Sequence, residues 1–245
     1  MRIYGLIGYP LSHSWSAQYF ADKFSQNKQQ NESYRLFPLR DLRDFPALLS
    51  SFPDLYGLNV TIPYKEKIMT YLDEIDDTAK QIGAVNTIKI IRHHNQVLSR
   101  GYNTDADGFM SSLPSGLSNM NALVLGTGGA SKAICHSLQQ LGMNYRLVSR
   151  KPENDRMLSY HDLNTSIISK FLLIINTTPL GMFPRTETYP PIPYSLLTPF
   201  HFLYDLIYNP PVTSFLKYGK EKGTKVKNGL EMLINQADLS YTIFQ

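Results

Sequence analysis

Three side chains with different hydrogen-bonding chemistry stand close together in the stretch GLNVTIPYKEK, residues 57–67. Asn59 and Thr61 are two residues apart in a run that alternates polar and apolar residues, so on a strand they point to the same face. Pro63 ends that strand, because proline has no N–H to donate to a sheet. Lys65 follows on the turn into the next element. Its ammonium is charged at neutral pH and can donate a proton during a reaction.

Further small polar groups stand in four other motifs. Ser14 and Ser16 lie in GYPLSHSWSAQYF, Asn86 in GAVNT, Asp105 in GYNTDADGF and Gln236 in GLEMLINQA. Each of these residues by itself could belong to a helix cap or a turn, since Ser, Asn and Asp favour both places. A single motif of this kind therefore favours a structural role over a catalytic one.

A glycine-rich turn lies between a buried strand and a helix in ALVLGTGGASKAI. Gly126, Gly128 and Gly129 would let the backbone approach a pyrophosphate, and the following helix offers N–H groups and the positive end of its dipole. Ser131 replaces the last glycine of the usual fingerprint, but it is small enough to pack there. The pattern predicts a dinucleotide site, with a tight turn that binds no ligand as the alternative.

Two cations follow the next strand, at Ser149-Arg150-Lys151. Sites that prefer NAD usually carry an acidic residue here, which hydrogen-bonds the ribose 2′-hydroxyl. An arginine presents a planar fork that suits a phosphate instead. The sequence therefore favours NADP over NAD, although an exposed pair of cations without a ligand is the simpler reading.

Alternating strands and helices must position these groups, and they indicate an α/β fold. In the first half, expected strands are 2–7, 34–38, 55–62, 84–91 and 96–98, and expected helices are 16–27, 41–50 and one beginning at 63. In the second half, expected strands are 123–125, 145–149, 171–176, 202–206 and 224–226, and expected helices are 131–141, 212–222 and 230–244. A join near 100–118 would separate two α/β domains, the second Rossmann-like. Ligands usually bind in the cleft between two such domains.

Composition excludes several classes of function. The 245 residues carry a net charge of +4, and the basic residues are too scattered for a nucleic-acid groove. The single cysteine, Cys135, excludes an intrachain disulfide and is best read as a small buried hydrophobe. No spacing suggests a metal site, and no apolar run approaches the ~20 residues that cross a bilayer. The first residues do not resemble a signal peptide, so we expect a cytoplasmic protein. We also expect a monomer or a homodimer.

Taken together and in order, the motifs resemble the shikimate dehydrogenase family. The matching stretches are HSWS, NVTIPYK, GAVNT, GYNTDADGF, GTGGAS, SR, INTTPLGM, YDLIYNP and GLEMLINQA, which span nearly the whole chain. The resemblance implies reversible reduction of 3-dehydroshikimate to shikimate with NADPH, within chorismate and aromatic amino-acid biosynthesis. It further implies a substrate domain of residues 1–101 plus 229–245 and an NADP-binding domain of residues 102–228.

The same resemblance implies a role for each matching position. Lys65 and Asp105 would be catalytic, with Asp105 positioning Lys65 and offsetting its loss of hydration. Substrate ligands would be Ser14 and Ser16 at the carboxylate, Asn59, Thr61, Asn86 and Gln236 around the ring, and Tyr208 closing the site. Cofactor positions would be Asp77, Gly126, Thr127, Gly128, Gly129, Ala130, Ser149, Arg150, Lys151, Thr177, Leu206 and Gly229.

Four residues depart from the family pattern. Ala17 stands where a proline is usual, Trp15 where a polar residue is usual, Thr127 where an alanine is usual, and Lys151 where a small polar residue is usual. Trp15 lies between the two predicted carboxylate ligands, so it bears on substrate range. Two alternatives stay open: a quinate/shikimate dehydrogenase of broader specificity, and a noncatalytic small-molecule-binding regulator of the same fold.

Overall fold

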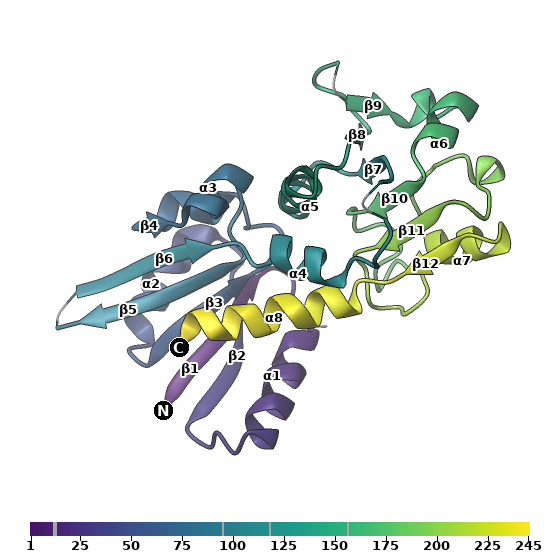
Figure 1. Ribbon diagram of the computed structural model, residues 1–245. Helices are drawn as coiled ribbons and strands as arrows, with labels where there is room; N and C mark the ends of the chain where they lie inside the picture. The colour runs from purple at the N-terminus through teal and green to yellow at the C-terminus, as the bar shows by residue number, and fades with distance from the viewer. Residues whose placement is uncertain (12–13, 95, 118, 156) are drawn as a thin grey trace. The chain divides into compact units, whose positions relative to one another are not determined.

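The computed structural model describes residues 1–11, 14–94, 96–117, 119–155 and 157–245. The chain forms two compact units, which Figure 1 shows by residue number. The first unit contains residues 1–104 and 237–245, and the second contains residues 105–236. The domain boundaries expected from the sequence differ from these by a few residues. The largest difference is at the last helix, whose beginning packs with the second unit: Met232 belongs to that unit's core.

The first unit is built on a mixed sheet. Its strands are β1 (Arg2–Gly8), β2 (Glu32–Pro38), β3 (Leu55–Val60), β4 (Glu74–Ile75), β5 (Thr87–His93) and β6 (Gln96–Tyr102). The order is β2-β1-β3-β5-β6-β4, with β1 parallel to β2 and β3, and β5 antiparallel to β3 and β6. The chain turns in opposite directions after β1 and β3, so a ligand crevice is expected where these two parallel strands end.

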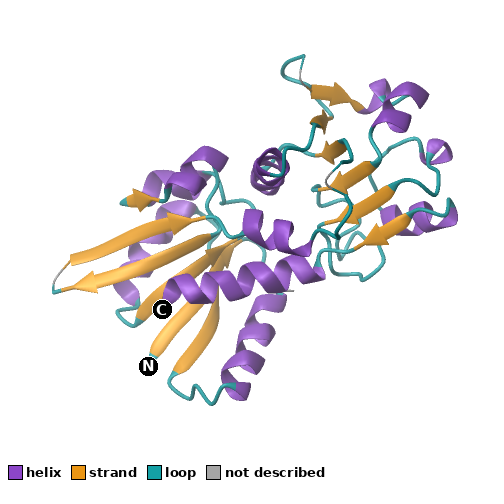
Figure 2. Cartoon of the chain, in the orientation of Figure 1, coloured by secondary structure: helices purple, strands orange, loops and turns teal. Residues whose placement is uncertain are grey.

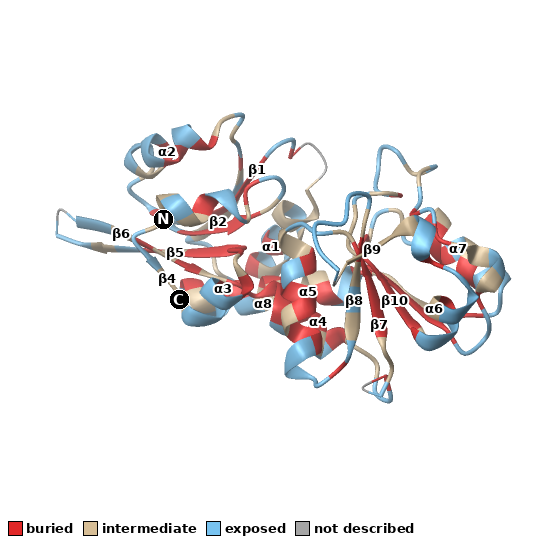
Figure 3. Ribbon diagram, turned by 90° about the horizontal axis from the view of Figure 1, so that it is seen from above, coloured by how far each residue is buried: buried red, intermediate tan, exposed pale blue. Residues whose placement is uncertain are grey.

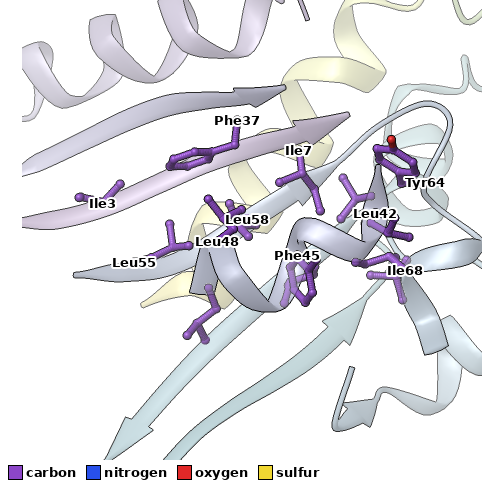
Figure 4. Packing of buried hydrophobic residues seen from close by; sticks show 14 of the residues in the cluster. Ile3, Ile7, Phe37, Leu42, Phe45, Leu48, Leu55, Leu58, Tyr64 and Ile68 are labelled. Carbon is purple, nitrogen blue, oxygen red and sulfur yellow. The ribbon is translucent and has the colours of Figure 1, made fainter. Parts of the chain in front are cut away.

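Helices cover both faces of this sheet. They are α1 (Trp15–Gln26), α2 (Phe45–Ser51) and α3 (Asp77–Ile82), with the short 3-10 turns η1 (Leu42–Asp44) and η2 (Lys67–Tyr71). Alternation along β1 sends Ile3 and Ile7 into a cluster beneath α2, which Figure 4 shows with Phe45. Tyr4 points to the other face, where it packs with Phe20 and Phe244.

The second unit is built on a parallel sheet. Its strands are β7 (Ala122–Leu125), β8 (Tyr145–Ser149), β9 (Met157–Ser159), β10 (Leu173–Asn176), β11 (Phe202–Asp205) and β12 (Lys225–Lys227). Their order is β12-β11-β10-β7-β8-β9, and each pairing described in this sheet is parallel. This is the strand order of a dinucleotide-binding fold, whose ligand crevice lies between the first and fourth strands, here β7 and β10.

The helices of this second unit precede, separate or follow its strands (Figure 2). They are α4 (Asp105–Ser112), α5 (Gly129–Gln140), α6 (Thr165–Lys170), α7 (Ser214–Glu221) and the first part of α8 (Leu230–Phe244), with the 3-10 turns η3 (Tyr160–Asp162) and η4 (Tyr194–Leu196). The central strands are fully buried (Figure 3), as their continuous apolar runs predict. Cys135 lies in this core, where burial raises the pKa of its thiol to about 12, so the prediction of a buried cysteine is confirmed.

Most expected elements are present, with shifted ends, and the last helix has the expected bounds of 230–244. The helix expected from Pro63 is wrong: only the 3-10 turn η2 forms, beginning at Lys67. The carbonyl of Lys65 accepts a hydrogen bond from the Val85 N–H, which takes an acceptor that a helix would need. The elements β4, α3, α4, β9 and α6 were not predicted from the sequence.

Candidate active site

The N-terminus of α1 presents two serine hydroxyls. Ser14 is the N-cap residue, but its side chain makes no capping hydrogen bond within the described residues. Ser16 lies in the first turn, and both residues are half-buried, so a ligand can reach them. The first turn carries no acidic side chain. N–H groups and the helix dipole favour an anion at this end, which agrees with the predicted carboxylate site. His13, which begins the HSWS motif, lies outside the described residues.

Backbone contacts hold Thr61 and Lys65 beyond the carboxyl end of β3. The Thr61 N–H donates to the Ile7 carbonyl at 2.9 Å, and the Val85 N–H donates to the Lys65 carbonyl at 2.7 Å. A Cβ at Gly8 would lie 2.5 Å from the Thr61 methyl group, so only glycine leaves room for that side chain. Thr61 and Lys65 are both half-buried and therefore accessible.

The two predicted amide ligands, Asn59 and Asn86, belong to a buried polar network. Asn59 is 6% exposed and Asn86 is 2% exposed. The Asn59 side chain accepts from the Tyr34 hydroxyl at 2.8 Å and donates to the Ser240 hydroxyl at 2.8 Å. The Asn86 Oδ1 accepts from the Thr104 N–H at 2.7 Å. Both amides therefore have firm protein partners.

Three hydroxyls connect those amides. Thr87 Oγ1 lies 2.7 Å from Ser240 Oγ and donates to Asn86 Oδ1 at 3.0 Å. Thr104 Oγ1 lies 3.0 Å from Ser240 Oγ and accepts from Asn86 Nδ2 at the same distance. A buried polar network that is fully hydrogen-bonded is rigid, so it holds its amides in one orientation.

Three residues predicted for the substrate site lie in the second unit. Asp105 is the first residue of α4 and is 4% exposed. Gln236 lies in α8, where its Nε2 donates to the Leu233 carbonyl at 2.9 Å. Tyr208 follows β11 and is half-buried. Lys65 belongs to the first unit, so its pairing with Asp105 stays a prediction.

The glycine turn follows β7, at the expected crevice of the second sheet. Gly126 has a φ of 114°, a conformation that side chains disfavour. A Cβ there would lie 2.8 Å from the Thr177 Oγ1, which itself donates to the Leu125 carbonyl at 2.7 Å. The predicted cofactor residues Gly126 and Thr177 therefore lie side by side, at the ends of β7 and β10.

Gly128 differs from Gly126. Its φ of −82° suits any residue, and a Cβ added to it would meet no described atom within 4 Å. Nothing in the described protein therefore requires glycine at this position. Gly128 is the N-cap of α5, and the next residues Gly129, Ala130 and Ser131 begin that helix, with Thr127 exposed just before it. An open helix N-terminus without a side chain fits the pyrophosphate of a dinucleotide.

The two cations lie where the prediction requires. Arg150 and Lys151 are exposed and directly follow β8, the neighbour of β7. Ser149 forms a local turn in which its Oγ donates to the Lys151 carbonyl at 3.0 Å. Arg150 also lies close enough to Tyr160 to oppose, by its charge, the increase in the pKa of that phenol caused by burial.

Two other predicted cofactor residues touch each other. A Cβ at Gly229 would lie 2.0 Å from the Leu206 carbonyl oxygen, and the Gly229 N–H donates to the Ile207 carbonyl at 3.1 Å. Asp77 belongs to the first unit. It is exposed at the start of α3 and forms an ion pair with Lys80 at 3.0 Å.

Sequence reasoning missed a buried carboxylate beside the cofactor loops. Asp205, at the end of β11, is completely buried and accepts from Asn176, Ile207 and Thr213. Burial raises its pKa to about 6, and these hydrogen bonds oppose the increase. The sequence did contain a signal for this pair. Asp205 lies in YDLIYNP and Asn176 lies in INTTPLGM, two of the motifs that carry the family resemblance.

No group of three or more His, Cys, Asp or Glu side chains in the described ranges could hold a metal ion. Among the helices that the structure describes, none is long and apolar enough to cross a membrane.

Residues 6–88 match the model of the shikimate dehydrogenase substrate binding domain. The chain is 40% identical over 256 residues to the shikimate dehydrogenase (NADP(+)) of Clostridium beijerinckii, covering 100% of this chain and 92% of that protein. The fold is similar to that of shikimate 5-dehydrogenase from Thermus thermophilus in complex with NADP(H) and shikimate, with a TM-score of 0.86, 29% identity, and coverage of 100% and 94%. It is also similar to quinate dehydrogenase from Corynebacterium glutamicum in complex with NAD, with a TM-score of 0.84, 25% identity, and coverage of 100% and 93%.

Proposed function

Because the chain belongs to the shikimate dehydrogenase family, we propose that it catalyses the reversible NADPH-dependent reduction of 3-dehydroshikimate to shikimate. This reaction is a step of chorismate and aromatic amino-acid biosynthesis. One observation carries the proposal: the chain combines a lysine among accessible hydroxyls with a glycine turn that is open at Gly128. A noncatalytic binding protein would need neither the lysine nor the cofactor turn.

In this proposal the substrate carboxylate binds Ser14 and Ser16 at the N-terminus of α1, where the helix dipole favours it. The ring hydroxyls are hydrogen-bonded by Asn59, Thr61, Lys65, Asn86, Asp105 and Gln236, with Tyr208 closing the site. Hydroxyl and amide partners are required because a buried polar group without a partner costs roughly 1–3 kcal/mol.

The chemistry of the proposal assigns one step to Lys65. When bound, NADPH would supply the hydride that reduces the ketone carbonyl. The C=O π electrons then move to the oxygen, and the Lys65 ammonium donates a proton to that oxygen, giving the alcohol. Asp105 positions Lys65. In the reverse direction the neutral amine removes the hydroxyl proton.

The cofactor assignment rests on the second unit. Gly126, Thr127, Gly128, Gly129 and Ala130 hold the pyrophosphate, Ser149, Arg150 and Lys151 lie at the 2′-phosphate, and Asp77, Thr177, Leu206 and Gly229 complete the set. The proposal keeps residues 102–228 as the NADP-binding domain and residues 1–101 plus 229–245 as the substrate domain, to which Asp77 and Gly229 belong.

Arg150 tests the choice of NADP over NAD. Loss of a charged hydrogen bond costs ~1.5–3 kcal/mol, so Arg150→Ala should weaken NADPH binding roughly ten- to a hundredfold and leave NADH binding nearly unchanged. Fluorescence titration with each cofactor measures this. Equal weakening of both cofactors contradicts the assignment of Arg150 to the 2′-phosphate.

The reaction itself is tested by cofactor absorbance. Purified protein is assayed with shikimate or quinate, each with NADP or NAD, and the proposal expects the highest kcat/KM for shikimate with NADP. Comparable rates with quinate support the broader quinate/shikimate dehydrogenase. No turnover of either substrate, with binding retained, supports the noncatalytic regulator.

A further inference from the structure

Tyr34 lies in β2, outside each motif that carries the family resemblance. Its ring stacks on Phe20 of α1, with ring centroids 4.3 Å apart and planes 12° from parallel. Burial raises the pKa of its phenol well above the ordinary value, so the hydroxyl keeps its proton at working pH and acts as a donor.

That hydroxyl contacts a predicted substrate ligand. It donates to the Asn59 Oδ1 at 2.8 Å. Since a phenol has one hydrogen, this bond uses the only hydrogen that Tyr34 can donate from its side chain. The two residues lie in separate elements, β2 and β3.

The orientation of the Asn59 amide depends on this contact. Its Nδ2 lies 2.8 Å from the Ser240 Oγ and 3.4 Å from the Asn86 carbonyl oxygen, which can only accept. The Oδ1 must therefore face Tyr34. Without the Tyr34 hydroxyl, the Asn59 Oδ1 would lose its hydrogen-bond donor. A buried acceptor without a donor is unfavourable enough to reorient the amide.

We propose that Tyr34 is a positioning residue of the substrate site, whose hydroxyl orients the Asn59 amide. This inference rests on the proposed function, because it takes Asn59 as a substrate ligand. Tyr34 itself does not touch the substrate.

The test replaces the hydroxyl and keeps the ring. Tyr34→Phe should raise the KM for shikimate about tenfold, the loss expected when one buried acceptor is left without its donor. The KM for NADP should stay within about twofold, since all the proposed cofactor residues except Asp77 lie in the other unit. A purely structural role would not separate the two constants.

Tyr241→Phe is the matched control. Tyr241 packs against the same aromatic cluster, and its hydroxyl donates to Glu32 at 2.6 Å rather than to a predicted ligand. Both variants lose one part-buried phenol hydroxyl, so both lower the melting temperature. Only Tyr34→Phe should raise the KM for shikimate, and equal increases in the two variants overturn the proposal.

Ser16→Ala separates this proposal from the proposed function. An increased KM for shikimate in Ser16→Ala with a wild-type value in Tyr34→Phe overturns the role of Tyr34 and leaves the substrate site standing. An unchanged KM in Ser16→Ala overturns the substrate site itself.

Ser240→Ala tests the same amide from its other side, should Tyr34→Phe not yield folded protein. It removes the nearest acceptor of the Asn59 Nδ2 and leaves the phenol in place. We expect an increase of about threefold in the KM for shikimate. A wild-type KM in a folded Ser240→Ala variant overturns the proposal.

Discussion

The two candidate sites are made from different materials. In the first unit, side chains form the site, and buried partners such as Tyr34, Thr104 and Ser240 hold its amides. In the second unit, backbone N–H groups form the site, and at Gly128 the described structure leaves the space open. A site made of side chains needs neighbours that orient them before the ligand arrives. A backbone site needs the absence of a side chain.

The two units also differ in buried charge. Among the described residues, the buried polar side chains of the first unit are neutral, as in the network around Asn59 and Asn86. The second unit buries Asp105 and Asp205. Acidity should therefore affect the stability of the second unit more than that of the first.

The largest expected effect concerns the side-chain site. Lys65→Ala removes the proposed proton donor and should lower kcat ~10²–10⁴-fold, the usual contribution of general acid catalysis. The KM for shikimate should change less, by about fivefold or under, because other groups hold the ring. Initial rates at saturating NADP measure both constants.

The control for this variant is Lys67→Ala. Lys67 is an exposed lysine two residues further along, at the start of η2, so its loss should change neither constant. If Lys65→Ala kept a kcat within about threefold of wild type, Lys65 would not be the acid.

The backbone site is tested by a pair of glycines. Gly128→Ala should leave the melting temperature unchanged, since φ is −82° and the added methyl group meets no described atom within 4 Å. It should nevertheless weaken NADP binding about tenfold or more, because the methyl group occupies the space of the pyrophosphate.

Gly126→Ala should behave in the opposite way. Its φ of 114° and the close Thr177 Oγ1 make the variant less stable by about 1–3 kcal/mol. Thermal unfolding and cofactor titration of both variants give the comparison. Equal losses of stability at the two glycines, or unchanged NADP binding in Gly128→Ala, would contradict an open backbone site.

The smallest expected effect concerns the buried charge of the second unit. Burial raises the pKa of Asp205 to about 6 in the folded protein, above the ordinary value near 3.9 of an unfolded chain. The folded state therefore binds the proton more tightly. The stabilisation is complete below pH ~4 and is lost as the pH rises through about 6.

Asp205→Asn removes this dependence. From pH 5 to pH 8, its free energy of unfolding should rise relative to wild type by about 1–2 kcal/mol. The altered hydrogen bonds of the variant add a cost that is the same at both pH values, so it does not affect this change. Urea unfolding at the two pH values measures the change. Asp155→Asn, an exposed carboxylate in the same unit, should show no such shift. An equal difference at both pH values for Asp205→Asn would refute the linkage.

Local patterns were enough to predict much of the fold. The period of two in Leu55–Val60, the apolar run before Asn176 and the long apolar face of Leu230–Phe244 each identified their element. The glycine turn was predicted with its strand and helix, because its signal is contiguous. The helices α3, α4 and α6 were missed, since elements of six to eight residues contain too few turns to show a period.

By itself, the sequence determined the two alternating α/β series, the glycine turn with its following cations, and the identity of the lysine after Pro63. Those features depend on neighbours along the chain, through backbone propensity and side-chain period. Only the tertiary structure decided that Tyr34 meets Asn59, 25 residues away, and that Ser240 meets it from a separation of 181 residues. Such pairings depend on how strands are ordered and helices packed, and no local pattern in a single sequence carries that information.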